Sequence, residues 1–271
     1  MKYLIGMDGG GTKTKCILTD INHNPLYETI SGPSNFLVIG TETVSETILN
    51  LVNECVSSQK ISVEDIEAIV LGTTGGGRRN DAELLEKKIF EEAKQKSLTI
   101  NKFRVESDAR IALEGSFSGK AGSILIAGTG SIMFGKDEEG EIHRVGGFGR
   151  FIGDEGSGYR IGRIGLNAVA RYFDGRSKPT KIADLLEQEF SIGSSETLIT
   201  EVYRNNFNIA AVAPLVFDAA ESGDKIAQRI LEDEANELML HITAMKLKLN
   251  VQIKEAEHSP EFGAALMAKQ I

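Results

Sequence analysis

The chain lacks an excess of positive charge and has few cysteines. Of its 271 residues, 39 are acidic and 30 are Lys or Arg, which gives a formal net charge of −9. Nucleic-acid binding requires a basic face, so we expect no such partner. The two cysteines, Cys16 and Cys55, lack metal-ligand spacing, and the low cysteine content is typical of a reducing compartment.

Long apolar runs are also absent. Segments such as Ile124 to Ala127 have the length of a strand, whereas a membrane-spanning helix needs about 20 apolar residues. The first residues already read as a strand, so we expect no signal peptide. The composition, 41% hydrophobic and 25% charged, is that of a globular protein long enough for two domains. We expect a soluble, cytoplasmic protein with no membrane partner.

The first strand ends in an unusual turn. The apolar run from Tyr3 to Met7 predicts a buried strand, and Asp8 follows at its end. Three glycines come next, and their backbone can approach a ligand closely and present N–H groups to an anion. A second predicted strand, Thr14 to Thr19, follows directly, so this turn joins a hairpin. It therefore matches neither the P-loop nor the dinucleotide fingerprint, both of which open a helix.

This turn has two interpretations. One is a glycine-rich hairpin without a ligand. The other is a site for nucleotide phosphates and a metal ion, which the carboxylate of Asp8, the hydroxyl of Thr12 and the cation of Lys13 favour. Lys13 itself fits a solvated strand residue.

The order of the next elements predicts a mixed sheet. A third strand, Pro25 to Ser31, completes an antiparallel meander, and later strands alternate with helices, which is typical of parallel pairing. Ligands of such sheets bind beyond the carboxyl ends of the strands. Asp8, Thr73 and Asp108 all fall at such ends, so we expect them to converge. For Asp108 a helix cap is the alternative interpretation.

A second cycle resembles the first. The predicted strand Ser123 to Ala127, a Gly-Thr-Gly-Ser turn and two further strands repeat the opening, which suggests two similar lobes that clamp one polyphosphate. A glycine-rich run, 146–158, carries Asp154 and Glu155 just before a predicted helix, where capping is again the alternative interpretation. Helices are predicted for the rest, including Phe207 to Glu221 and Asp224 to about Leu249.

The ordered set of motifs resembles a known family. Asp8-Gly-Gly-Gly-Thr-Lys13, Ser107-Asp108-Ala109, Ala127-Gly-Thr-Gly-Ser131 and Gly153-Asp-Glu-Gly-Ser157 together resemble the BadF/BadG/BcrA/BcrD ATPase family, and within it the N-acetylglucosamine kinases of the actin–hexokinase–Hsp70 superfamily. Each motif alone is weak, but the resemblance covers nearly the whole chain.

The resemblance implies an α/β fold of two ribonuclease-H-like (actin-like ATPase) lobes with a central cleft for ATP, Mg²⁺ and sugar. The lobes would comprise 1–117 and 118–271, the second with helical additions. One strand–turn–helix unit, which packs on adenosine in relatives, is missing from this sequence after about residue 250.

The resemblance also implies residue roles. Asp8 would hold Mg²⁺, and Asp108 would be the catalytic base. The two phosphate loops would be Gly9, Gly10, Gly11 and Thr12, and Gly128, Thr129, Gly130 and Ser131. The residues near the sugar would be Asn35, Thr74, Asp108, Gly147, Phe148 and Asp154.

The implied activity is ATP-dependent phosphorylation of the 6-hydroxyl of N-acetylglucosamine or a related amino sugar, by a homodimer. N-acetylmuramate, glucosamine and N-acetylmannosamine stay open as substrates. One alternative is an ATPase activator of a radical dehydratase or reductase, which would need cysteines for an iron–sulfur cluster. Another is a non-catalytic sugar or nucleotide sensor, which would bind its ligand without releasing ADP.

Overall fold

The protein forms two compact units in the computed structural model, which describes residues 1–249 and 258–270. The first unit comprises 1–124, 134–142 and the described part of 251–271. The second comprises 125–133 and the described part of 143–250. Within the described residues, no helix combines the length and the apolar character that crossing a bilayer requires.

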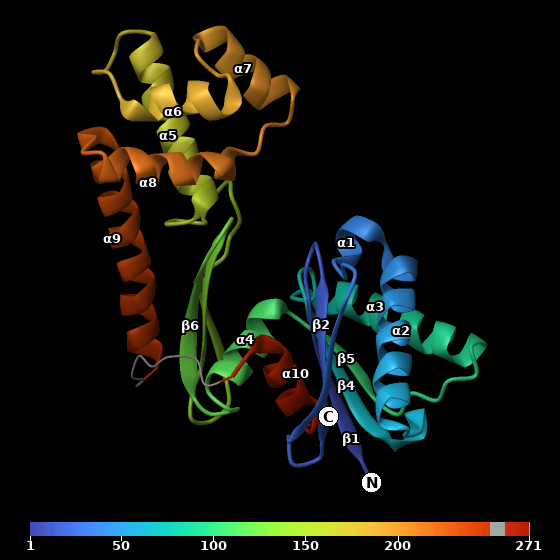
Figure 1. Cartoon of the computed structure of the whole chain (residues 1–271). Coiled ribbons are helices and arrows are strands. Elements are labelled where there is room, and N and C mark those ends of the chain that lie inside the picture. The colour runs from blue at the N-terminus through green and yellow to red at the C-terminus, as the bar shows by residue number, and fades with distance from the viewer. Residues whose placement is uncertain (250–257, 271) are drawn as a thin grey trace. The chain divides into compact units, whose positions relative to one another are not determined.

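The first unit is built on a sheet that has five strands in the described chain, in the order β3-β2-β1-β4-β5 (Figure 1). The strands are β1 (Tyr3–Gly9), β2 (Thr14–Asp20), β3 (Pro25–Ser31), β4 (Ile66–Thr73) and β5 (Phe103–Glu106). β1, β2 and β3 pair antiparallel, while β4 runs parallel to both β1 and β5. The predicted meander and the parallel strands are therefore confirmed, and the glycines do join a hairpin.

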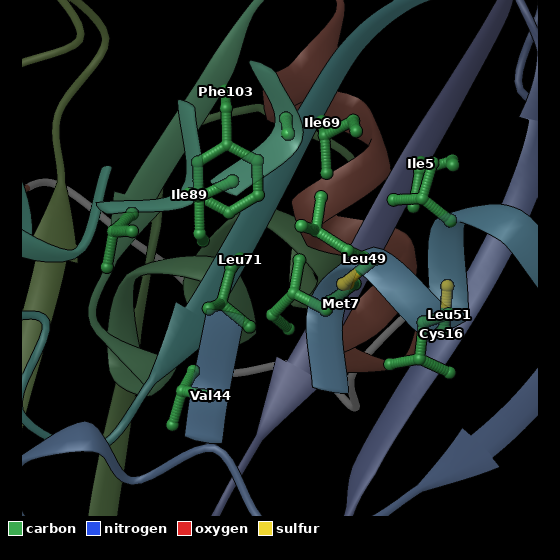
Figure 2. Packing of buried hydrophobic residues seen from close by; sticks show 14 of the residues in the cluster. Ile5, Met7, Cys16, Val44, Leu49, Leu51, Ile69, Leu71, Ile89 and Phe103 are labelled. Atoms are coloured by element: carbon green, nitrogen blue, oxygen red, sulfur yellow. The ribbon is translucent and has the colours of Figure 1, made fainter. Parts of the chain in front are cut away.

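Side chains of alternating residues fill the two faces of this sheet. On one face, Ile5 and Met7 pack with residues of α2 (Thr41–Gln59) and α3 (Arg79–Gln95), as Figure 2 shows. On the other face, Leu4 joins a cluster with α4 (Asp108–Ser116) and α10 (Pro260–Ala268). Burial of both faces explains why β1 and β4 read as nearly continuous apolar runs. Two short elements complete the unit, α1 (Phe36–Ile39) and the 3-10 helix η1 (Val63–Asp65).

The final helix lies in a different place from the one predicted. The sequence assigned it to a second lobe of residues 118–271, but α10 packs against α4 and β1 in the first unit. Gly263 makes this possible, because a Cβ there would collide with the carbonyl oxygen of Ile111. The lobe bounds and the cleft stay predictions. The place after about residue 250, where the sequence lacks the strand–turn–helix unit of the relatives, falls on 250–257, outside the described residues.

The second unit contains a helical core. A sheet in the order β6-β7-β8 contributes residues to both units; its strands are β6 (Gly122–Ala127), β7 (Ser131–Lys136) and β8 (Ile142–Gly146). The helices are α5 (Gly158–Phe173), α6 (Lys181–Phe190), α7 (Ser195–Arg204), α8 (Ala213–Glu221) and α9 (Lys225–Lys248). Their core includes Val169, Leu186 and Val216, all fully buried.

Two helix predictions in the second unit need correction. The predicted helix from Phe207 to Glu221 is instead a 3-10 turn, η2 (Ile209–Val212), followed by α8. Pro214 lies in the first turn of α8, where proline is favoured because its missing N–H has no partner to lose. Helix α7 was not given as a separate helix in the largely helical region that the sequence predicted, although Ser194 and Thr197 cap its start reciprocally. Asp224 was predicted as the N-cap of α9, and this is confirmed by its bonds to the N–H groups of Ile226 and Ala227.

Candidate functional site

The glycine turn of the first unit presents free backbone donors. The N–H of Gly10 donates to the carbonyl of Lys13 at 2.9 Å, which closes the turn. Gly11 and Thr12 are exposed, and within the described residues their N–H groups take part in no backbone hydrogen bond. Donors of this kind suit an anion such as a phosphate. Lys13 is exposed, in line with a solvated residue.

The turn rests on a neighbouring loop. A Cβ at Gly9 would collide with the hydroxyl of Ser34, so glycine is required there. The N–H of Ser34 donates to the carbonyl of Gly10 at 3.0 Å, and the Thr73 hydroxyl donates to the carbonyl of Ser34 at 2.9 Å. Next to Ser34, the side-chain oxygen of Asn35 is buried and has no hydrogen-bond partner in the described structure. A polar ligand group beside Asn35 would satisfy that oxygen.

Asp108 lies where the strand ends meet. Gly9 pairs with Thr73 across β1 and β4, and Gly72 pairs with Glu106 across β4 and β5, so these strands end at one edge of the sheet. The Thr74 hydroxyl donates to a carboxylate oxygen of Asp108 at 3.0 Å. The predicted convergence of this region is therefore observed within the first unit.

Asp108 is not the cap of its helix. Ser107 is the N-cap of α4, and its side chain accepts from the N–H of Arg110 at 3.1 Å. Asp108 is the first helical residue and is exposed, with one oxygen accepting from the N–H of Ala109 at 2.8 Å. The carboxylate thus remains accessible to a ligand at the N-terminus of α4.

Asp8 is the carboxylate nearest the glycine turn in sequence, and it is half-buried at the end of β1. Among the described residues, no group of three or more His, Cys, Asp and Glu side chains could hold a metal ion. Mg²⁺ in phosphoryl-transfer enzymes uses one or two carboxylates together with phosphate oxygens and water. A single carboxylate next to exposed backbone N–H groups fits that mode of binding.

In the second unit, the start of α5 is bonded to the turn that holds Gly128 to Ser131. The N–H groups of Gly158 and Tyr159 donate to the carbonyls of Gly128 and Thr129, at 2.8 and 3.2 Å. The Ser131 hydroxyl donates to the carbonyl of Glu155 at 2.6 Å. Hydrogen bonds therefore hold this turn and the loop before α5 together.

Asp154 lies against this turn. Its backbone is left-handed, with φ of 59°, and only 9% of the residue is exposed. A Cβ at Gly130 would lie 2.9 Å from a carboxylate oxygen of Asp154, closer than real Cβ contacts. Ser157, which accepts from the N–H of Arg160, is the N-cap of α5. Asp154 is therefore not a capping residue.

Gly147 and Phe148 occupy the start of the same loop. Gly147 has φ of 71°, and a Cβ there would collide with Ile132. Phe148 is 63% exposed, and the Arg144 guanidinium lies 5.2 Å from its ring centroid. An exposed aromatic ring of this kind can pack on the apolar face of a ligand, but its role as a sugar contact stays a prediction.

A cavity of about 570 Å³ brings three predicted residues together within the second unit. They are Thr129, Gly130 and Asp154. The sequence did not predict the other walls of the cavity, namely Arg150, Phe151, Tyr159, Val202, Asn206, Phe207, Asn208 and Ile209. The Arg150 guanidinium stacks on the rings of Phe151 and Tyr159, with centroid distances of 5.1 and 5.7 Å. The residues in 202–209 carry no motif that could have identified them as cavity residues. The only signal for Arg150 is its position within the glycine-rich run.

The two cysteines lie in the core of the first unit, where Figure 2 labels Cys16. Cys16 and Cys55 are at most 1% exposed, and their sulfur atoms are 3.5 Å apart. The hydrogen bond with Cys55, together with burial, raises the pKa of the Cys16 thiol well above its ordinary value. Protonated, buried thiols are poor metal ligands.

Comparison with known proteins identifies the family. The model of the BadF/BadG/BcrA/BcrD ATPase family matches residues 5–255. The chain belongs to this family. The α/β, actin-like ATPase fold class that the sequence predicted is therefore confirmed.

Individual relatives are amino-sugar kinases. The chain is 37% identical to the N-acetylmuramic acid/N-acetylglucosamine kinase of Clostridium acetobutylicum, over 94% of this chain and 83% of that protein. It is 32% identical to the N-acetyl-D-glucosamine kinase of Dictyostelium discoideum, over 94% and 82%. Its fold is similar to that of a Chromobacterium violaceum protein assigned as an N-acetylglucosamine kinase, with a TM-score of 0.77, 22% identity and coverage of 100% and 99%.

Proposed function

We propose that this protein is an ATP-dependent kinase that phosphorylates the 6-hydroxyl of N-acetylglucosamine or a related amino sugar. The observation that carries the proposal is the exposed carboxylate of Asp108, bonded to Thr74 at the sheet edge where the Gly9–Thr12 turn also begins. The names of the two relatives in Clostridium and Dictyostelium support the substrate class.

Asp108 is the proposed general base. Its carboxylate would accept the proton of the sugar hydroxyl as that oxygen attacks the γ-phosphorus of ATP, a role that contributes typically about 10²–10⁴-fold in rate. The Thr74 hydroxyl, which donates to Asp108, would orient the carboxylate. Because Ser107 caps α4, proton transfer does not compete with helix capping.

The two glycine turns are the proposed phosphate-binding elements. The N–H groups of Gly11 and Thr12 are the donors of the first turn, and the segment from Gly128 to Ser131 forms the second. Phosphoryl transfer depends mainly on positioning and on neutralising negative charge, which backbone donors supply without rearrangement. Mg²⁺ held by Asp8 would add charge neutralisation at the phosphates.

The proposed sugar contacts include two polar side chains with observed local surroundings. Asn35 contributes its unsatisfied amide oxygen, and Asp154 contributes a carboxylate held at the wall of the cavity. Gly147 and Phe148 belong to the same proposed set. Hydroxyl and acetamido groups of an amino sugar are the hydrogen-bond partners that such side chains require.

The test is ADP release by the wild-type protein with Mg-ATP and a panel of amino sugars. The panel is N-acetylglucosamine, N-acetylmuramate, glucosamine and N-acetylmannosamine. Release that depends on one of these sugars supports the proposal and names the substrate. A folded protein that releases no ADP with any of them contradicts it and favours the sensor interpretation.

The activator interpretation lacks support from the cysteines, since both are buried in the core, in contact with each other. Two further proposals follow from the family resemblance: a cytoplasmic location and a homodimer. Sedimentation of the purified chain tests the dimer, and a mass equal to one chain at micromolar concentration would contradict it.

A further inference from the structure

We infer that Glu234 is a positioning residue, which fixes both the turn at Gly128–Ser131 and the loop that carries Asp154. This inference rests on the proposed function, because it concerns the same site. Glu234 lies on α9, in the second unit, and only 4% of the residue is exposed. One carboxylate oxygen accepts from the N–H of Gly156 at 2.7 Å, and the other lies 3.4 Å from Nε of Arg160.

The two partners of Glu234 flank the start of α5. Gly156 precedes the cap residue Ser157, and Arg160 lies in the first turn of the helix. The same first turn donates N–H groups to the carbonyls of Gly128 and Thr129. Glu234 is therefore two hydrogen bonds away from the turn at Gly128–Ser131, and its partner Gly156 lies two positions after Asp154.

Other side chains of α9 support the same loop. Leu238 and His241 follow Glu234 at spacings of four and three residues, so all three lie on one face of the helix. Glycine backbones approach this face closely, because a Cβ at Gly156 would collide with Leu238 and one at Gly146 would collide with His241. Nε2 of His241 also lies 3.9 Å from a carboxylate oxygen of Glu155.

The burial of the Glu234 carboxylate against the loop before α5 needs a physical explanation. Transfer of an ionised group from water into a protein interior costs several kcal/mol, and an apolar pair of similar volume is often as stable. Leu238 shows that α9 can pack an apolar side chain against the loop. A carboxylate, however, accepts a directional, charge-assisted bond from a single backbone N–H, and so fixes the position of Gly156.

The position matters because the proposed reaction needs accurate geometry. A displacement of about 1 Å at a reacting centre can reduce the rate by about 10²-fold. Release of Gly156 would free the start of α5, and with it the carbonyls of Gly128 and Thr129. Asp154 has a left-handed backbone, with φ of 59°, and depends on its surroundings to keep that conformation.

The test compares E234A and E234Q with the wild-type chain. E232A is the matched control, because Glu232 is an exposed residue of the same helix. Amide hydrogen exchange, read by mass spectrometry, should become at least about 10-fold faster in E234A within 126–132 and 152–161. Segments of β1 to β5 should keep wild-type rates. E234Q retains an acceptor for the N–H of Gly156, so its exchange rates in these two segments should lie between those of the wild type and E234A. E232A should exchange at the wild-type rates.

Kinetics supply the second readout. We expect kcat/KM to fall by about 10²-fold in E234A, mainly through kcat, and to recover partly in E234Q. Uniformly faster exchange would indicate a purely structural ion pair and overturn the inference. Unchanged exchange in both segments, or the same effect in E232A, would also overturn it. If the wild-type protein shows no sugar-dependent ADP release, the proposed function fails, and the exchange pattern alone decides the role of Glu234.

Discussion

In the first unit a sheet sets the positions of the candidate residues, whereas in the second unit hydrogen bonds between a loop and helices set them. Asp8 is the last residue but one of β1, Thr74 directly follows β4, and Asp108 follows β5, so strand order and register bring these positions to one edge. Asp154 and Thr129 lie on irregular backbone, and Glu155, Tyr159 and the more distant Glu234 hold it in place.

The difference indicates which substitutions each unit can accept without a change in the positions of its candidate site residues. In the first unit, a conservative change of a side chain at the sheet edge leaves the frame intact, since the frame is the buried sheet core. In the second unit, the frame consists of backbone contacts around glycines, so one added methyl group displaces the site itself. A side-chain substitution at the sheet edge of the first unit should therefore change activity without changing the sheet. A substitution of a glycine in the second unit should change activity by moving the site residues.

The largest expected effect is that of Asp108→Asn. We expect kcat to fall by about 10²–10⁴-fold, because the amide cannot accept the sugar proton, while the unfolding midpoint stays near that of the wild type. Sugar-dependent ADP release and thermal unfolding measure the two quantities. If D108N instead retains wild-type kcat, Asp108 is not the base, and the first unit has no identified catalytic group.

The next effect is that of Gly130→Ala, which tests the second unit. The new Cβ would meet the carboxylate of Asp154 at 2.9 Å, so we expect kcat/KM to fall by about 10²-fold as Asp154 moves. Gly128→Ala is the control for packing, because a Cβ at Gly128 has no protein atom within 4 Å. An equal loss in both variants would assign the effect to ligand approach rather than to the displacement of Asp154.

Much of the first unit follows from its sequence. Apolar runs locate β1 and β4, and the parallel arrangement then predicts that Asp108 lies near the glycine turn. The role of Ser107 as the cap of α4 was not predicted, because serine and aspartate are both good N-caps and adjacent here. The place of α10 was also missed, since nothing in the local pattern of a helix says which unit it packs against.

Much of the second unit does not follow from its sequence. Glu234 lies 78 residues from its backbone partner Gly156, and no motif links them. Asn206 and Asn208 reach the cavity from the segment between α7 and α8, and a short polar segment there reads as an ordinary connection. The glycine-rich run was visible, but the contacts that require each glycine depend on the tertiary fold.

A smaller effect concerns the stability of the first unit. Alanine normally stabilises a helix relative to glycine by roughly 1 kcal/mol. At Gly263 we expect the opposite, a loss of about 1–3 kcal/mol, because the added methyl group would collide with the Ile111 carbonyl and force α10 off α4. Denaturant unfolding of Gly263→Ala measures this loss, and Gly32→Ala is the control, since its Cβ has no atom within 4 Å. An unchanged or raised stability would contradict the packing of α10.

The smallest effect is pH-dependent and concerns Asp224 in the second unit. Partial burial raises the pKa of this carboxyl, but bonds from the Thr180 hydroxyl and from the N–H groups of Ala227, Lys181 and Ile226 outweigh it and hold the pKa below the ordinary value of 3.8. Its contribution to stability is therefore complete above pH 3.8 and is lost as the pH falls through the lowered pKa.

Asp224→Ala should then cost about 1 kcal/mol at pH 7, through the lost N-cap of α9. The difference from the wild type should shrink below pH 3.8. Thermal unfolding midpoints of both proteins at pH 7 and pH 3 measure it. A difference that stays constant with pH would mean that the charge of Asp224 does not contribute.

The most direct test of the central proposal is identification of the product by phosphorus and proton NMR, after the wild-type chain has been incubated with Mg-ATP and N-acetylglucosamine or the best sugar of the panel. The proposal predicts one sugar phosphate for each ADP, with the phosphorus coupled to the protons on carbon 6. ADP without a sugar phosphate, or a phosphate on another carbon, would contradict it.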